Sequence, residues 1–336
     1  MRLLIAMPHA EDGSAANWLA EPWRWPGWAT AEIQRQAPAV AVEFAAGAGG
    51  HDDGWARADA AIAFRVSPAQ LARARRLRWL HCPSAAVHQL LTPELVASSV
   101  LVTHGAAVHG EAVAEHGLAL MLAMARGIPL AVRLQERRRW DPALVWRQPG
   151  GLTLLSETTV LILGLGHIGR PLARALHALG ARVLGIRRRA EGSVPGCDEV
   201  HEMAALPRLL PQADYVVLAL PVTPASRLLF GREALALMRP GARMVNLGRG
   251  ELVDESALLE ALRRDGLGGA ALDVVGREPL PEDSPLWSDE RVLITPHTAG
   301  MSDSSWRRQL LLIAENLRRF QAGEPLLEPV DKARGY

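Results

Sequence analysis

A glycine-rich turn near the middle of the chain has the residues and spacing that bind a dinucleotide. Gly164, Gly166 and Gly169 form a G-x-G-x-x-G pattern, which follows the apolar run 159–163 and opens a helical stretch closed by Gly180. The first glycine permits a tight turn, the second lets the backbone approach a pyrophosphate, and the third allows close helix–strand packing. The start of the helix then presents N–H groups to the phosphates. This context favours a dinucleotide site over a glycine turn that binds nothing.

The residues after the next apolar run indicate which dinucleotide is bound. A site for NAD usually carries Asp or Glu about 20 residues beyond the glycine pattern, where the carboxylate bonds the ribose 2′-hydroxyl. This chain has Arg187, Arg188 and Arg189 at that place. Guanidinium groups suit a bidentate contact with a 2′-phosphate. We therefore expect NADP(H) to be preferred, with NAD(H) kept as the alternative if these arginines only lie in solvent.

Three further segments place polar residues directly after predicted strands. They are 246–250 (NLGRG), 272–280 (LDVVGREPL) and 295–300 (TPHTAG). With the glycine pattern ahead of them, and in this order, they closely resemble the D-isomer-specific 2-hydroxyacid dehydrogenases. The resemblance runs from about residue 58 to the C-terminal residues and is most specific between 160 and 300.

The resemblance assigns the catalytic roles to Arg249, Glu278 and His297. It implies hydride transfer between NADP(H) and a small 2-oxo acid or D-2-hydroxy acid. Arg249 can hold the substrate carboxylate and polarise the ketone oxygen, and His297 can act as general acid or base. Glu278 beside the imidazole would stabilise its protonated form. We expect mainly reduction, with glyoxylate or hydroxypyruvate as the substrate.

The same resemblance implies further cofactor contacts and a partner. Asp273 is assigned to the nicotinamide carboxamide. The other implied cofactor-binding residues are Gly164, Gly166, His167, Ile168, Gly169, Arg187, Arg188, Pro221, Leu247, Gly248 and Gly300. The segment 111–116 resembles the family's helix that packs across a two-fold interface, so we expect a homodimer. Glu115 and His116 within it are also explained as helix-surface or interface groups.

The loop that follows the apolar run 77–82 departs from the family pattern. In the family, backbone N–H groups of this loop bind the substrate carboxylate, and the loop usually ends in Gly-x-Asp. Here Ala86 stands in place of Gly and His88 in place of Asp. Backbone donors tolerate alanine where φ is negative. We therefore expect Ala85 and Ala86 to bind the substrate together with Arg249 and His297, while the loop shape and the substrate size differ.

Positioning these residues requires two α/β domains. Short apolar runs alternate with helical stretches up to residue 103, and repeated β-α-β patterns after residue 150 predict a parallel sheet. The amphipathic stretch 303–321 is expected to return to the first domain. We predict two doubly wound domains, with a Rossmann cofactor domain (104–298) inserted into a flavodoxin-like substrate domain (1–103 and 299–336). The active site is expected in the cleft between them.

Composition excludes several other classes of function. The chain of 336 residues has 37 basic and 36 acidic residues, so no strong field favours nucleic acid or a membrane surface. Lys332 is the only lysine, which nearly excludes Schiff-base chemistry. Two cysteines and histidine spacings that match no standard site predict no bound metal. No apolar run reaches 18 residues and the N-terminal run is too short for a signal peptide, so we expect a cytoplasmic protein.

Two alternatives stay open at this point. Formate or phosphite dehydrogenases share the scaffold, but they would need extra polar substrate contacts that the sequence does not reveal. Some relatives are nucleotide-sensing corepressors, although the near-zero net charge and the lack of long disordered tails argue against this function. Oxidation of NADPH by short 2-oxo acids would separate an enzyme from such a sensor.

Overall fold

The computed structural model describes residues 1–7, 23–45, 53–264 and 266–336. The chain divides into two compact units, Met1–His109 with Met301–Tyr336, and Gly110–Gly300. Sequence patterns place these boundaries slightly earlier, at 103/104 and 298/299. The first boundary falls inside helix α5 (Ala106–Ala125), because that helix begins in one unit and continues into the other.

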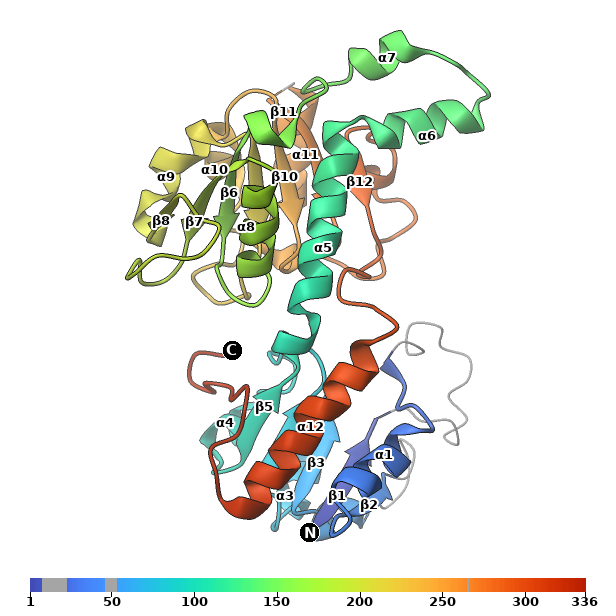
Figure 1. Cartoon of the computed structure of the whole chain (residues 1–336), viewed down its shortest axis with the longest axis vertical. Helices are drawn as coiled ribbons and strands as arrows, with labels where there is room; N and C mark the ends of the chain where they lie inside the picture. The colour runs from blue at the N-terminus through green and yellow to red at the C-terminus, as the bar shows by residue number, and fades with distance from the viewer. Residues whose placement is uncertain (8–22, 46–52, 265) are drawn as a thin grey trace. The chain divides into compact units, whose positions relative to one another are not determined.

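The first unit is built on a parallel five-stranded sheet in the order β2-β1-β3-β4-β5. This is the strand order of a doubly wound flavodoxin-like sheet, so the predicted fold is confirmed. One face carries α1 and α12, and the other carries α2, α3 and α4 (Figure 1). The elements are β1 (Arg2–Ala6), α1 (Ala29–Gln36), β2 (Ala41–Phe44), α2 (Gly54–Arg57), β3 (Ala60–Ala63), α3 (Pro68–Arg73), β4 (Trp79–Cys82), α4 (Pro93–Ala97), β5 (Leu101–His104) and α12 (Ser305–Ala322).

Local sequence explains how the helices of this unit begin and pack. Ser67 caps α3 by accepting a hydrogen bond from the Gln70 N–H, and the Gln70 side chain accepts one from the Ser67 N–H, as in a capping box. In α12, Leu310, Ile313 and Leu317 recur at helical spacing and are buried against the sheet. The chain therefore returns to the first unit through the apolar face of its last helix.

The first unit also contains a tryptophan-rich segment near its N-terminus and a partly buried contact of the only lysine. In the tryptophan-rich segment 22–28, Trp25 is buried in the core and Trp28 is about half exposed, while residue 22 lies outside the described residues. At the other end of the chain, the Lys332 ammonium donates to the carbonyl oxygens of Leu95, Ser98 and Val100, at 3.2, 2.6 and 3.1 Å. This side chain ties the C-terminal segment to the end of α4 and the start of β5.

The second unit contains a parallel seven-stranded sheet in the order β12-β11-β10-β9-β6-β7-β8. The order reverses between β6 and β9, as in a Rossmann sheet, which confirms the predicted fold. The elements are α5, α6 (Ile128–Glu136), α7 (Pro142–Trp146), β6 (Thr159–Leu163), α8 (Gly169–Ala178), β7 (Arg182–Ile186), β8 (Glu199–His201), α9 (Leu206–Leu209), β9 (Tyr215–Leu218), α10 (Arg232–Leu237), β10 (Ala242–Asn246), α11 (Glu255–Arg263), β11 (Leu267–Leu272) and β12 (Val292–Ile294).

Helices cover both faces of this sheet (Figure 1). Along β6, Val160 and Ile162 pack in the core that α5 and α8 share, whereas Leu161 and Leu163 pack towards α9, α10 and α11. Burial on both faces explains why these strands read as continuous apolar runs. Among the described residues no single helix is long and apolar enough to span a membrane, and only the bent pair of α5 and α6 passes that test by length and composition.

Candidate active site

The predicted residues of the second unit follow the carboxyl ends of its parallel strands. Because all the strands run in the same direction, these ends lie along one edge of the sheet, where α/β proteins bind ligands. Successive strands contribute Gly164–Gly169 after β6, Arg187 and Arg188 after β7, Pro221 after β9, Leu247, Gly248 and Arg249 after β10, Asp273 and Glu278 after β11, and His297 and Gly300 after β12.

Glu278 and His297 form a directly bonded pair at this edge. Nδ1 of His297 lies 2.7 Å from Oε2 of Glu278, and the other carboxylate oxygen accepts the Val275 N–H at 3.2 Å. Burial alone raises the pKa of Glu278, but the hydrogen bond with His297 and the charges of His297 and Arg249 outweigh it, so the pKa lies below the ordinary 4.5. The His297 side chain is 46% exposed and that of Glu278 is 38% exposed, so a ligand can reach the imidazole.

Arg249 supplies a half-buried positive charge close to this pair. Burial lowers its pKa, and the carboxylates of Glu278 and Glu251 oppose that effect. Asn246 shapes the turn that carries it: its side-chain oxygen accepts the Gly248 N–H at 3.1 Å, and its side-chain amide donates to the Arg249 carbonyl at 2.9 Å. The three residues therefore combine a fixed cation, an imidazole and a carboxylate.

The backbone of His297 is unusual. Its φ of +53° is in the left-handed region, which costs a non-glycine residue about 1–3 kcal/mol and persists only where neighbouring contacts enforce it. The buried Asp273 supplies such contacts. Its carbonyl accepts the His297 N–H at 2.9 Å, and its carboxylate accepts the N–H groups of Thr298 and Ala299 at 3.0 and 3.2 Å.

The glycine turn after β6 has room for a phosphate group. Gly164 has a φ of +102°, and a Cβ there would clash with the Ala219 carbonyl oxygen; a Cβ on Gly169 would clash with the Gly164 carbonyl oxygen. A Cβ on Gly166 would meet no described atom within 4 Å. The fold itself therefore requires the first and third glycines, whereas the second leaves its backbone open to a ligand, as a dinucleotide pyrophosphate requires.

The arginines after β7 differ in their surroundings. Arg187 is half-buried, and its Nη2 donates to the Gly192 carbonyl at 3.2 Å. Its buried Nε has no hydrogen-bond partner in the described part of the chain. Arg188 and Arg189 are exposed. Their place at the end of the second strand of the sheet is compatible with a contact to the ribose end of a dinucleotide.

Ala85 and Ala86 lie in the first unit, in the loop after β4. Histidines pin the carbonyls of this loop: His109 Nε2 is 3.0 Å from the Pro83 oxygen and His104 Nδ1 is 3.0 Å from the Ala85 oxygen. The Ala86 N–H donates to the Ser84 hydroxyl at 3.2 Å, whereas the Ala85 N–H has no partner among the described residues. The loop can therefore offer at least one backbone donor to an anion.

Sequence reasoning missed several residues that support the site. Asn246 and Thr295 were visible only as parts of motifs, and His116 was explained as a surface or interface group. In the structure His116 is part of a hydrogen-bonded chain, with its Nε2 2.9 Å from the Thr295 hydroxyl and 3.6 Å from Asp273. Contacts between residues 179 positions apart leave no local signal in one sequence.

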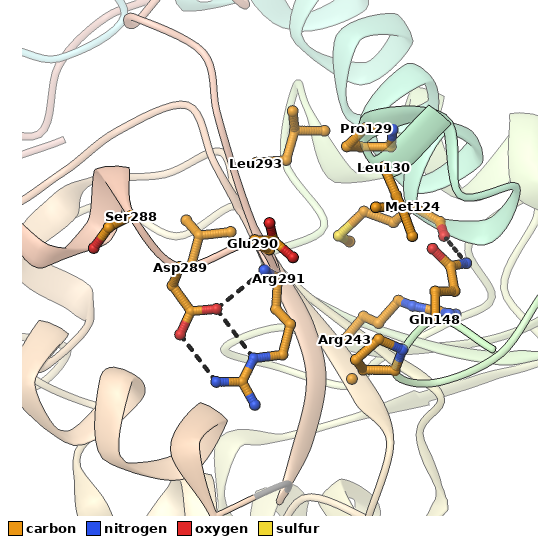
Figure 2. Close-up of a pocket in the computed structure, with 13 residues that line it drawn as sticks. Met124, Pro129, Leu130, Gln148, Arg243, Ser288, Asp289, Glu290, Arg291 and Leu293 are labelled. Atoms are coloured by element: carbon orange, nitrogen blue, oxygen red, sulfur yellow. Dashed lines mark hydrogen bonds and ion pairs between the residues drawn. The ribbon is translucent and has the colours of Figure 1, made fainter. Parts of the chain in front are cut away.

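A cavity of about 420 Å³ lies at the opposite edge of the same sheet (Figure 2). It is lined by the amino ends of β10, β11 and β12 and by residues near α6. Arg243 on its wall donates to the Gly151 carbonyl and the Tyr215 hydroxyl, at 2.6 and 3.0 Å, and Arg291 forms an ion pair with Asp289. It contains no predicted site residue, and its two arginines are already engaged within the chain.

Comparison with known proteins places the chain among oxidoreductases. The model of the D-isomer-specific 2-hydroxyacid dehydrogenase family, NAD-binding domain, matches residues 118–299. A glyoxylate reductase of Korarchaeum cryptofilum is 34% identical over 234 residues, covering 69% of each chain. A D-3-phosphoglycerate dehydrogenase of Methanocaldococcus jannaschii is 31% identical over 260 residues, which are 77% of this chain and 48% of that protein. The chain thus spans about half of the latter's length.

Solved structures agree over the whole chain. A D-isomer-specific 2-hydroxyacid dehydrogenase from Xanthobacter autotrophicus, in complex with NADPH and MES, superposes with a TM-score of 0.83 at 32% identity and covers 100% of this chain and 99% of its own. An NADPH-dependent glyoxylate/hydroxypyruvate reductase from Sinorhizobium meliloti, in complex with NADP and sulfate, gives 0.83 at 26% identity with the same coverage.

Proposed function

The chain belongs to the D-isomer-specific 2-hydroxyacid dehydrogenase family, and from this premise we propose that it is an NADP(H)-preferring reductase of small 2-oxo acids, with glyoxylate or hydroxypyruvate as substrate. The observation that carries this proposal is the 2.7 Å pair of His297 and Glu278, with the half-buried Arg249 close enough for its charge to act on Glu278. When bound, the reduced nicotinamide supplies a hydride to the substrate carbonyl carbon.

The roles of the three residues follow from their chemistry. Arg249 binds the substrate carboxylate and the carbonyl oxygen through its planar set of N–H donors. Because Nδ1 of His297 faces Glu278, Nε2 is the atom that gives a proton to the developing alkoxide. Glu278 stays ionised and stabilises the imidazolium that this step requires. In the oxidative direction neutral His297 takes the proton back.

Contacts at the substrate carboxylate and the cofactor complete the proposal. The loop with Ala85 and Ala86 offers backbone N–H groups to the carboxylate. Arg187 and Arg188 bind the 2′-phosphate, because no acidic residue stands at the end of β7 and guanidinium groups match a phosphate. The relatives crystallised with NADPH or NADP support this preference. We place the reaction in the cytoplasm, where reduced nicotinamide cofactor is supplied.

We also propose that the working form is a homodimer. Apolar side chains of the segment around α6 and α7 are exposed, including Ile128, Val132 and Trp146, and Trp140 is 96% exposed. Single exposed apolar side chains need no explanation, but several within one short segment favour an interaction surface. A second copy of the chain is the occupant that we propose for this surface.

A substrate panel tests the proposed reaction. Purified protein is mixed with NADPH or NADH and with glyoxylate, hydroxypyruvate or pyruvate, and in separate assays with NADP⁺ or NAD⁺ and with formate or phosphite, and the absorbance of the reduced cofactor is followed. We expect the highest kcat/KM with NADPH and one of the first two acids. Turnover of formate or phosphite alone would move the chain to a different reaction, and cofactor binding without turnover of any acid would favour a sensor.

A further inference from the structure

One buried carboxylate holds the loop that carries His297. Asp273 accepts the His297 N–H with its main-chain carbonyl and the next two N–H groups with its side chain. These bonds hold the backbone of His297, whose φ is +53°, and of the two residues that follow it. Any movement of the Asp273 carboxylate would therefore release a backbone conformation that is uncommon for residues other than glycine.

A hydrogen-bonded chain fixes that carboxylate from the other side. The Thr295 hydroxyl lies 2.7 Å from Oδ1 of Asp273 and 2.9 Å from Nε2 of His116. A carboxylate only accepts, so the Thr295 proton must point to Asp273. The hydroxyl oxygen then accepts from His116, which must carry its proton on Nε2. The direction of every bond in the chain from His116 through Thr295 to Asp273 is thus determined.

Helix α5 is well suited to anchor this chain. It packs in the core of the second unit beside β6, and His116 is followed by Gly117, where a Cβ would clash with the Leu247 side chain. The same turn of α5 therefore touches the segment that leads to Arg249 and bonds the segment that leads to His297. Helix α5 therefore links the segment that carries Arg249 to the segment that carries His297.

We propose that His116 is a positioning residue, which acts through Thr295 and Asp273 to hold the His297 loop in its strained conformation. Its effect on catalysis rests on the proposed function, but its effect on the loop does not. What His116 contributes is one N–H donor at a fixed point, and neither its charge nor its bulk is required.

Two substitutions of His116 distinguish the effect of its N–H donor from the effect of its side-chain volume. His116→Gln keeps a donor near the position of Nε2, whereas His116→Leu keeps similar bulk and removes the donor. We expect His116→Leu to lower kcat about 10- to 100-fold with little change in the KM for the 2-oxo acid, and His116→Gln to recover most of the loss. His177→Leu, at an exposed position of α8, is the control and should match the wild type.

A second readout does not depend on turnover. Amide hydrogen exchange of the peptide that contains 297–299 should speed up at least several-fold in His116→Leu and stay close to wild type in His116→Gln. If the wild type reduces no 2-oxo acid, the proposed function fails while this measurement still tests the positioning role. Equal exchange in the Gln and Leu variants, or equal kcat in an active enzyme, would overturn that role.

Thr295, the middle residue of the hydrogen-bonded series from His116 to Asp273, gives a matched test if His116→Leu does not fold. Thr295→Ser keeps the hydroxyl and Thr295→Val removes it at nearly constant size. We expect faster exchange of 297–299 in the Val variant only. Where His116→Leu does fold, adding Thr295→Val to it should change the exchange rate little further, because both substitutions break the same series of hydrogen bonds. Fully additive losses would show that the two residues act separately and would contradict the proposal.

Discussion

At the scale of single residues, the proposed proton transfer would depend on the charge state of the His297–Glu278 pair. The carboxylate has a lowered pKa and remains an anion near neutral pH, next to a ring whose other nitrogen is left for a substrate. General acid–base groups of this kind contribute about 10²–10⁴-fold to a rate.

Replacement of the imidazole tests the acid role directly. His297→Ala should lower kcat by about two to four decades, because no other proton donor replaces Nε2. The affinity for NADPH, measured by fluorescence titration, should survive. His177→Ala is the matched control on the surface of the same unit. Unchanged turnover in His297→Ala would show that the proton comes from elsewhere.

The pH dependence tests the role of Glu278. Its pKa is lowered in the folded protein, so its stabilising contribution is present above pH 4.5 and is lost as pH falls through the lower folded value. Glu278→Gln removes the anion that favours imidazolium. We expect the alkaline limb of the reduction rate to move to lower pH in this variant. A pH profile of the same shape and position as wild type would contradict the assigned role.

The sequence offered these residues as candidates, but it did not contain their geometry. The family resemblance of three short segments after predicted strands assigned roles to Arg249, Glu278 and His297. The left-handed φ of His297 and its support by His116 arise from contacts between distant segments. Likewise, Asp273 was expected to serve the nicotinamide, and its bonds to Thr298 and Ala299 became visible only in the structure.

At the scale of elements, buried strands were the easiest to predict. Strand β6 has the bounds of the apolar run 159–163, which clear turn signals flank. Strand β8 was missed, because its three residues are half-exposed at the sheet edge and carry no apolar pattern. Helix α5 begins at Ala106, earlier than the segment 111–116 for which the sequence predicted a helix.

The end of β7 is the element that should select the cofactor. Arg187→Asp combined with Arg188→Ala replaces the cations with a carboxylate at the place where NAD sites carry one. We expect the ratio of kcat/KM for NADPH to that for NADH to fall at least tenfold. Arg182→Ala, at the amino end of the same strand, is the control. A constant ratio in the double variant would mean that these arginines are ordinary surface groups.

At the scale of the whole molecule, the two units follow known sheet topologies, and the segment around α6 and α7 leaves apolar surface uncovered. Trp140→Glu combined with Trp146→Glu should shift the protein from dimer to monomer in sedimentation experiments, because charge would be buried at the proposed interface. Trp287→Glu changes another exposed tryptophan of this unit and should leave the dimer intact. A monomeric wild type would contradict the proposal.

Chemical modification of the single lysine, Lys332, can report when the C-terminal segment detaches from the first unit. Its ammonium is held by three carbonyl oxygens, and burial lowers its pKa. An amine-directed acylating reagent can modify this side chain only after it leaves those carbonyls. Because no other lysine competes, the rate at which the peptide around residue 332 gains the mass of the acyl group would measure how fast the C-terminal segment detaches, and no residue has to be substituted.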